Sequence, residues 1–90
     1  RKEMRALRRR IRGLMKADNT LDALGLLCPV PIIKTKIKLA EMAGGQVLEV
    51  LADDEGFLID LPAWCKKTGN EFLGIEKEVD FFKGYVRRAR

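Results

Sequence analysis

The chain has 90 residues, with 18 Lys and Arg against 13 Asp and Glu, a formal net charge of +5. This length suits one small domain. The sequence has no histidine, and its two cysteines, Cys28 and Cys65, are too few for a disulfide framework and not in metal-ligand spacing. Cys-His and Ser-His-Asp catalysis are therefore excluded, and neither a metal nor a cofactor is expected. Free thiols favour a cytoplasmic location, and no apolar run approaches the roughly 20 residues that span a bilayer.

The basic charge lies at one end of the chain. Residues 1–16 hold eight Lys or Arg and one Glu, whereas residues 17–90 hold ten basic and twelve acidic side chains. Residues 1–17 are predicted to be a basic amphipathic helix or a linker, and residues 18–90 the folded domain. A linker helix is favoured over a membrane or nucleic-acid arm, because this segment lacks aromatic residues to stack on bases. Since the chain does not start with Met, a fragment of a longer protein is one interpretation.

The first predicted elements are a strand and a helix. Residues 20–24 alternate apolar with polar side chains, which favours a strand. The clearest helix runs from Val30 to about Ala43 and ends at Gly44-Gly45, a typical left-handed cap. Its predicted apolar face contains Ile33, Ile37 and Ala40, flanked by Ile32, Leu39 and Ala43.

The second half of the chain adds three strands and a helix. Residues 46–52 alternate as a strand buried on at least one side, and 53–56 form a turn. A second helix should begin near Asp60, which places Pro62 in its first turn, and should end at 68–70. Residues 71–77 and 81–88 form a hairpin. The order β-α-β-α-β-β predicts an α+β fold, a two-layer α/β sandwich with both helices on one face of a four-stranded mixed sheet.

The run Cys28-Pro29-Val30-Pro31 is the motif that carries chemistry. Cys28 is predicted at the N-cap of the first helix, with Pro29 at the first helical position and the N–H of Val30 directed at the sulfur. The helix N-terminus, with Lys34 and Lys36 nearby, should then favour the thiolate, which is the nucleophile. Cys65 lies among apolar residues inside the second predicted helix, so core packing is favoured over a resolving thiol.

Residues 21–31, from Leu21-Asp22-Ala23-Leu24-Gly25 through the two prolines, resemble the signature of the TusA/SirA-like sulfur carrier family. The similarity extends over roughly residues 20–88, in register with the whole predicted β-α-β-α-β-β pattern. It implies that Cys28 takes up sulfane sulfur as a persulfide from a cysteine desulfurase or a rhodanese-like donor and passes it to an acceptor protein, without independent turnover. Pro29 and Pro31 belong to the same site, and Lys34, Lys36 and Phe57 are candidate partner contacts.

Two departures from the family pattern bear on the partners. Leu24 stands where the family often has Arg, and residues 56–59 are apolar where the family tends to be polar. The apolar segment at residues 56–59 is similar to that of versions of the domain fused to rhodanese-like, DsrE-like or flavin-dependent disulfide reductase modules. Phe57 and Ile59 then either fill the core or form a docking patch for a neighbouring module. The alternative functions are a non-catalytic protein- or RNA-binding regulatory module, and a thiol-redox domain that uses Cys28 and Cys65.

Overall fold

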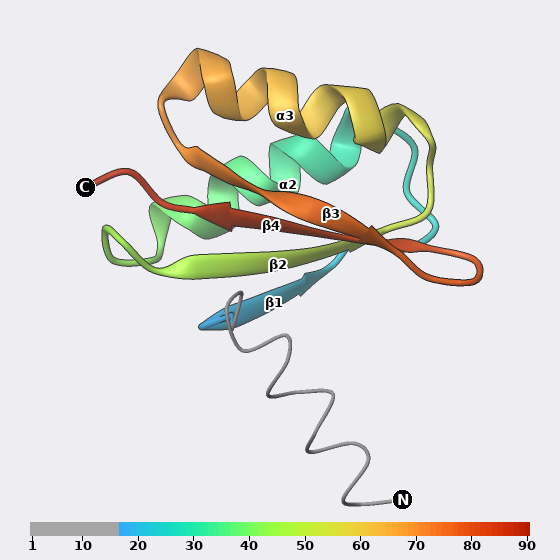
Figure 1. Ribbon diagram of the computed structural model, residues 1–90, viewed down its shortest axis with the longest axis horizontal. Coiled ribbons are helices and arrows are strands. Elements are labelled where there is room, and N and C mark those ends of the chain that lie inside the picture. Colours follow the sequence, from blue (N-terminus) through green and yellow to red (C-terminus); the bar gives the residue numbers. More distant parts are fainter. Residues whose placement is uncertain (1–16) are drawn as a thin grey trace, which may run out of the picture.

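The computed structural model describes residues 17–90, so the helix predicted within residues 1–17 lies outside the described residues apart from its last position. The elements follow one another as predicted (Figure 1). They are β1 (Asn19–Asp22), α2 (Val30–Ala40), β2 (Val47–Ala52), α3 (Gly56–Thr68), β3 (Glu71–Lys77) and β4 (Phe82–Arg87).

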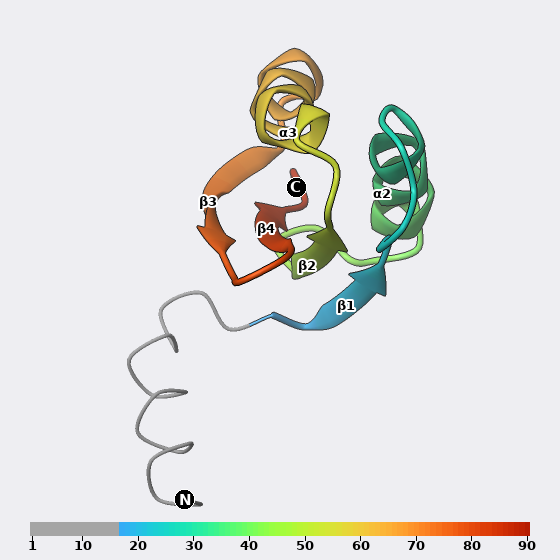
Figure 2. The same ribbon diagram turned by 90° about the vertical axis from the view of Figure 1, so that its right-hand side faces the viewer.

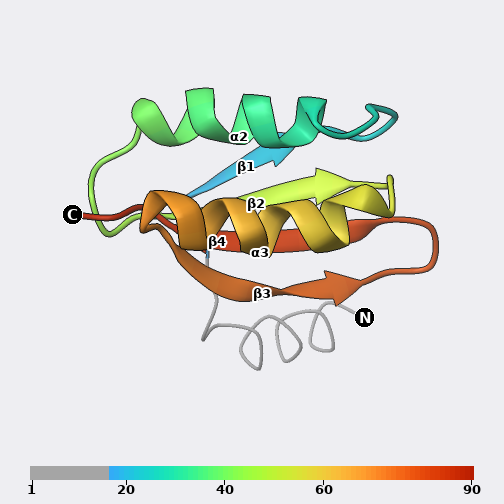
Figure 3. The ribbon, with the colours of Figure 1, turned by 90° about the horizontal axis from the view of Figure 1, so that it is seen from above.

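The strands form one mixed sheet in the order β1-β2-β4-β3. β1 and β2 are parallel and are joined through α2, whereas β4 runs antiparallel to both of its neighbours. Both helices lie on the same face of this sheet, side by side (Figures 2 and 3). The predicted two-layer α+β fold is therefore confirmed.

The core lies between the sheet and the helical layer. On β2, Leu48, Val50 and Ala52 are fully buried, in keeping with the predicted alternation. On α3 the buried side chains are Phe57, Leu61 and Cys65. The core packing predicted for Cys65 is thus confirmed.

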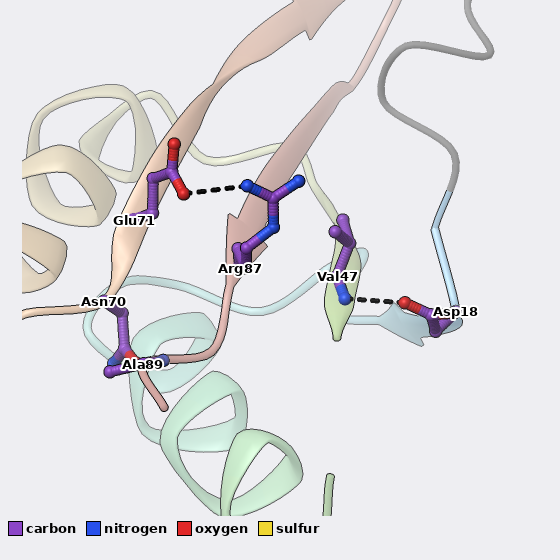
Figure 4. Close-up of polar contacts among 6 residues, drawn as sticks. All are labelled: Asp18, Val47, Asn70, Glu71, Arg87 and Ala89. Carbon is purple, nitrogen blue, oxygen red and sulfur yellow. Dashed lines mark hydrogen bonds and ion pairs between the residues drawn. The ribbon is translucent and has the colours of Figure 1, made fainter. Parts of the chain in front are cut away.

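One end of the sheet is held by three polar contacts among four neighbouring segments (Figure 4). The Val47 amide donates to Asp18 Oδ2 at 2.8 Å, and the Ala89 amide donates to Asn70 Oδ1 at 2.8 Å. An Arg87–Glu71 ion pair of 2.9 Å ties β4 to the start of β3. Because β1 and β2 both start at this end, their carboxyl ends, and the N-termini of both helices, meet at the opposite end.

The face that α2 turns to the core differs from the prediction. The buried residues are Pro31, Ile32, Thr35 and Leu39, whereas Ile33 and Ile37 are 51% and 57% exposed. The physical reason is that the Thr35 hydroxyl donates to the Pro31 carbonyl at 2.8 Å, which satisfies a polar side chain inside the core. With apolar side chains on several sides of the helix, periodicity alone placed the face wrongly.

Both helices also differ in length from the prediction. α2 ends at Ala40, and the amides of Glu41 and Met42 bond three residues back in a tighter turn before Gly44. α3 starts at Gly56, so Pro62 lies inside the helix rather than in its first turn. The early start follows from the preceding acidic turn, because Asp54 Oδ2 accepts the Gly56 amide at 3.2 Å and the Asp54 carbonyl accepts the Phe57 amide at 3.0 Å.

Phe57 packs directly on the backbone of β4. A Cβ added to Gly84 would lie 2.5 Å from Leu61 Cδ2 and 2.8 Å from Phe57 Cζ. Only glycine leaves room for the helix at this distance from the sheet. We expect Gly84→Ala to lower the free energy of unfolding by about 1–3 kcal/mol through overpacking.

Chemical denaturation measures this loss, with Val79→Ala as control because Val79 is fully exposed in the β3–β4 turn. The control should stay within about 0.5 kcal/mol of wild type. Equal stability of Gly84→Ala and wild type would show that the contact between α3 and β4 is not close-packed.

Candidate functional site

Cys28 lies at the end of the molecule where both helices begin. It belongs to the loop that leads from β1 into α2, and its side chain is partly buried against the core. A Cβ added to Gly56, the first residue of α3, would lie 3.3 Å from Cys28 Cβ and 3.8 Å from Cys28 Sγ. The thiol therefore lies against the N-terminus of α3, and the cysteine loop approaches this closely because residue 56 has no side chain.

Two carboxylates from the turn after β2 hold the cysteine loop. Both oxygens of Asp53 accept the Gly25 amide, at 3.1 and 3.0 Å. Asp54 Oδ2 accepts the amides of both Cys28, at 3.3 Å, and Gly56, at 3.2 Å. A single carboxylate thus joins the cysteine loop to the first turn of α3.

Sequence reasoning missed this role and treated residues 53–56 only as a turn. A signal was present, because two carboxylates directly follow the carboxyl end of a buried parallel strand. Loops that carry functional residues gather at that edge of such a sheet.

The helix start around Cys28 differs from the prediction. The N-cap is Pro29, not Cys28, and the Cys28–Pro29 peptide bond is cis. The Val30 amide donates to the Leu27 carbonyl at 2.9 Å, so it is not directed at the sulfur. Pro31 occupies the second helical position and is buried. The expected donation of a helix N–H to the thiolate is therefore wrong.

The electrostatics at the thiol are also opposite to the prediction. Burial, then the charge and hydrogen bond of Asp60 and lastly those of Asp54, raise the pKa of Cys28 from 9.0 to about 11. Desolvation and nearby negative charge both disfavour a thiolate, and either carboxylate can accept a hydrogen bond from the protonated thiol. At neutral pH the free protein thus holds Cys28 as a thiol. Local reasoning could not find this, since Asp54 and Asp60 follow Cys28 by 26 and 32 residues.

The three predicted partner contacts do not share one surface. Lys34 and Lys36 are exposed on α2. Phe57 has no exposed surface, because its ring fills the core against β4, so its prediction as a partner contact is wrong. Of the apolar patch at 56–59, Ile59 is the strongly exposed member, at 74%.

A direct disulfide between Cys28 and Cys65 does not fit the geometry. Cys28 contacts Gly56, and nine residues of α3 separate Gly56 from Cys65, a helical rise of about 13.5 Å. A disulfide requires Cα atoms within roughly 7 Å. Cys65 is also 1% exposed and lies inside the core. The thiol-redox alternative therefore has no support from the structure.

Within residues 17–90, no group of three or more His, Cys, Asp or Glu side chains is placed to hold a metal ion. None of the helices in this part of the chain is long and apolar enough to cross a membrane.

Known proteins resemble this chain in both sequence and fold. Residues 19–88 match the sequence profile of the family described as sulfurtransferase TusA. The chain belongs to the TusA family. The sulfur carrier protein TusA of Allochromatium vinosum is 42% identical over 72 residues, which cover 80% of this chain and 95% of that protein. A crystal structure of a SirA-like protein from Desulfitobacterium hafniense matches with a TM-score of 0.70 at 30% identity, over 80% of this chain and 99% of that one.

Some members of the TusA family are longer than this chain. YrkF of Bacillus subtilis (strain 168) is 47% identical over 76 residues, which cover 84% of this chain but 41% of YrkF. The chain therefore spans about two-fifths of that relative. The relatives from Allochromatium vinosum and Pseudomonas entomophila are both named sulfur carrier protein TusA, which supports a sulfur carrier role.

The carboxylate beside Cys28 can be tested by its effect on thiol reactivity. In Asp60→Asn the pKa of Cys28 should fall, because a negative charge and a strong hydrogen-bond acceptor for the thiol are removed. Each pKa unit changes the thiolate fraction tenfold below the pKa, so alkylation of Cys28 by iodoacetamide at pH 8 should become on the order of tenfold faster. In wild type the rate should rise with pH until about 11.

The matched control is Asp80→Asn, which removes an exposed carboxylate from the β3–β4 turn. Its alkylation rate should equal that of wild type. An Asp60→Asn profile that coincides with wild type would show that this carboxylate does not act on the thiol.

Proposed function

We propose that Cys28 carries sulfane sulfur as a persulfide, receives it from a donor protein and hands it to an acceptor protein. The observation that carries this proposal is the clamp on the cysteine loop, in which Asp54 positions the backbone of the half-buried Cys28 next to Gly56. Membership of the TusA family supports the same role. A carrier needs a positioned thiol that a partner can reach, and it needs no base or metal of its own.

The transfer is a displacement at sulfur. The Cys28 thiol loses its proton and attacks the outer sulfur of the donor's cysteine persulfide. A new S–S bond forms on Cys28, the donor's S–S bond breaks, and the donor cysteine leaves as a thiolate that takes up a proton. Delivery is the same exchange, with the acceptor's thiolate attacking the outer sulfur carried on Cys28. No net oxidant or reductant is consumed in either step.

The raised pKa of Cys28 suits this role. In the free protein the thiol is protonated and reacts slowly with adventitious electrophiles. A donor that brings positive charge against Asp60 and Asp54 would lower the pKa of Cys28 and create the thiolate only within the complex. Reactivity is then coupled to docking.

The neighbouring residues have supporting roles in this proposal. Pro29 and Pro31 restrict the backbone on either side of the first helical residue, which fixes the direction of the cysteine loop. Lys34 and Lys36 contact the partner from α2. The donor is a cysteine desulfurase or a rhodanese-like protein, and the exchange takes place in the cytoplasm, where both cysteines stay reduced.

Persulfide loading tests the proposal. The protein is incubated with a cysteine desulfurase and cysteine, or with a rhodanese and thiosulfate, and intact-mass spectrometry without reductant follows it. We expect one added sulfur atom, placed on Cys28 by peptide mapping and removed by dithiothreitol.

Cys28→Ser should take up no sulfur, whereas Cys65→Ser should load like wild type because Cys65 is buried. Loading of Cys28→Ser equal to wild type would contradict the proposal. So would the absence of any adduct on wild type with both donors.

A further inference from the structure

An exposed apolar stripe runs from Cys28 along α2. Leu27, Val30, Ile33 and Ile37 are 72%, 38%, 51% and 57% exposed. The spacing of three and four residues places the last three on one face of the helix, opposite the buried Thr35 and Leu39. The stripe accounts for half of the large exposed apolar side chains of residues 17–90, and it starts one residue before the reactive thiol. Isolated exposed apolar residues need no explanation, but a continuous stripe beside a functional group does.

Lysines border this stripe on both sides. With about 100° between successive residues, Lys36 falls on one flank of the line through Ile33 and Ile37, and Lys34 on the other. Both are exposed, and neither pairs with a carboxylate within residues 17–90. Lys38, in contrast, lies 3.7 Å from Glu41. The flanks of the stripe therefore carry positive charge that no described residue neutralises.

We propose that the sulfur-exchange partner docks along this stripe, through a protein surface whose apolar side chains are bordered by carboxylates. The inference rests on the proposed function and adds the surface and the chemistry of the partner to it. Apolar contact with Ile33 and Ile37 would supply affinity, and carboxylates opposite Lys34 and Lys36 would set the register. A partner that binds along the stripe would extend to Leu27. Because Leu27 directly precedes Cys28, the partner's reactive sulfur would then lie beside the Cys28 thiol.

The charges on this surface disfavour the other occupants. A second copy of the chain would bring Lys34 and Lys36 against their own counterparts, a like-charge contact. An anionic membrane would attract the lysines but would be repelled at the thiol end, where Asp53, Asp54 and Asp60 gather. A protein surface has neither conflict, because it can place carboxylates opposite Lys34 and Lys36 and positive charge opposite the aspartates at the thiol end.

The test measures persulfide on Cys28 of the full chain, expressed in its native host and isolated with alkylation of free thiols. In the double variant Ile33→Gln/Ile37→Gln, the persulfidated fraction of Cys28 should fall about fivefold or more, because two anchor side chains of the interface are lost. Val79→Gln changes an exposed apolar residue of the β3–β4 turn, outside α2, and should match wild type. Chemical loading with inorganic polysulfide needs no docking, so all three proteins should load alike.

A second pair of variants tests the charges. Lys34→Glu with Lys36→Glu should lower the persulfidated fraction by a similar factor. The matched control, Lys66→Glu with Lys67→Glu, reverses two exposed lysines on α3 and should have no effect. Thermal unfolding verifies that the variants keep the fold.

The outcomes separate the two proposals. Equal persulfidation of wild type and the Ile33/Ile37 variant in the host would overturn docking along the stripe and leave the carrier function intact. A stripe-dependent dimer in sedimentation, or stripe-dependent binding to anionic phospholipid vesicles, would overturn it in favour of another occupant. If wild type carries no persulfide in the host and takes none from polysulfide, the proposed function fails, and the docking inference fails with it.

Discussion

The carboxylate of Asp54 is the contact on which the site depends. Its Oδ2 atom accepts the amides of Cys28 and of Gly56, so one group fixes the cysteine loop and the start of α3 together. The fold supplies what this bond requires. The parallel pairing of β1 and β2 brings their carboxyl ends to the same edge of the sheet, and each strand is followed there by one of the two loops. The polar contacts at the opposite end hold the strands in register without intruding on the thiol.

The surroundings of this contact also set the chemical character of Cys28. Burial raises the pKa of the thiol most, followed by the negative charge of Asp60 and then by that of Asp54. A catalytic cysteine without a partner protein would react slowly in such surroundings, because the raised pKa lowers its thiolate fraction. For a carrier the low thiolate fraction is useful, because the thiol should react with a docked partner and not with every electrophile. Asp54 therefore both positions the cysteine loop and adds to the restraint that burial and Asp60 impose on the thiol.

Much of the architecture could be predicted from the sequence because it follows from local periodicity. The alternation in β2 and the glycine that ends α3 are local signals, and the element order implied the sheet. The error in α2 arose because apolar side chains lie on several of its sides, so periodicity did not single out the buried face. Thr35 can enter the core only because it bonds to the Pro31 carbonyl, and that buried face leaves Ile33 and Ile37 exposed.

For the functional site, the local sequence identified the cysteine but not its surroundings. Cys28 could be singled out because two prolines, Pro29 and Pro31, follow it closely. Its pKa, however, depends on Asp60 and Asp54, which only the folded chain brings near the thiol. Phe57 is buried because Gly84, 27 residues later, leaves space for its ring. No residue near Phe57 in the sequence identifies that partner, so the choice between a core position and a docking patch stayed open.

The central claim is that sulfur placed on Cys28 moves onward to another protein, and a label chase tests this most directly. Wild-type protein is loaded with radioactive sulfane sulfur, freed of its donor and added to an extract of its native host. The account predicts that the label leaves Cys28 and appears covalently bound in a macromolecular acceptor, more slowly when Ile33 and Ile37 are both replaced by Gln. Label that stays on Cys28, or that is released only as free sulfide, would contradict a carrier function.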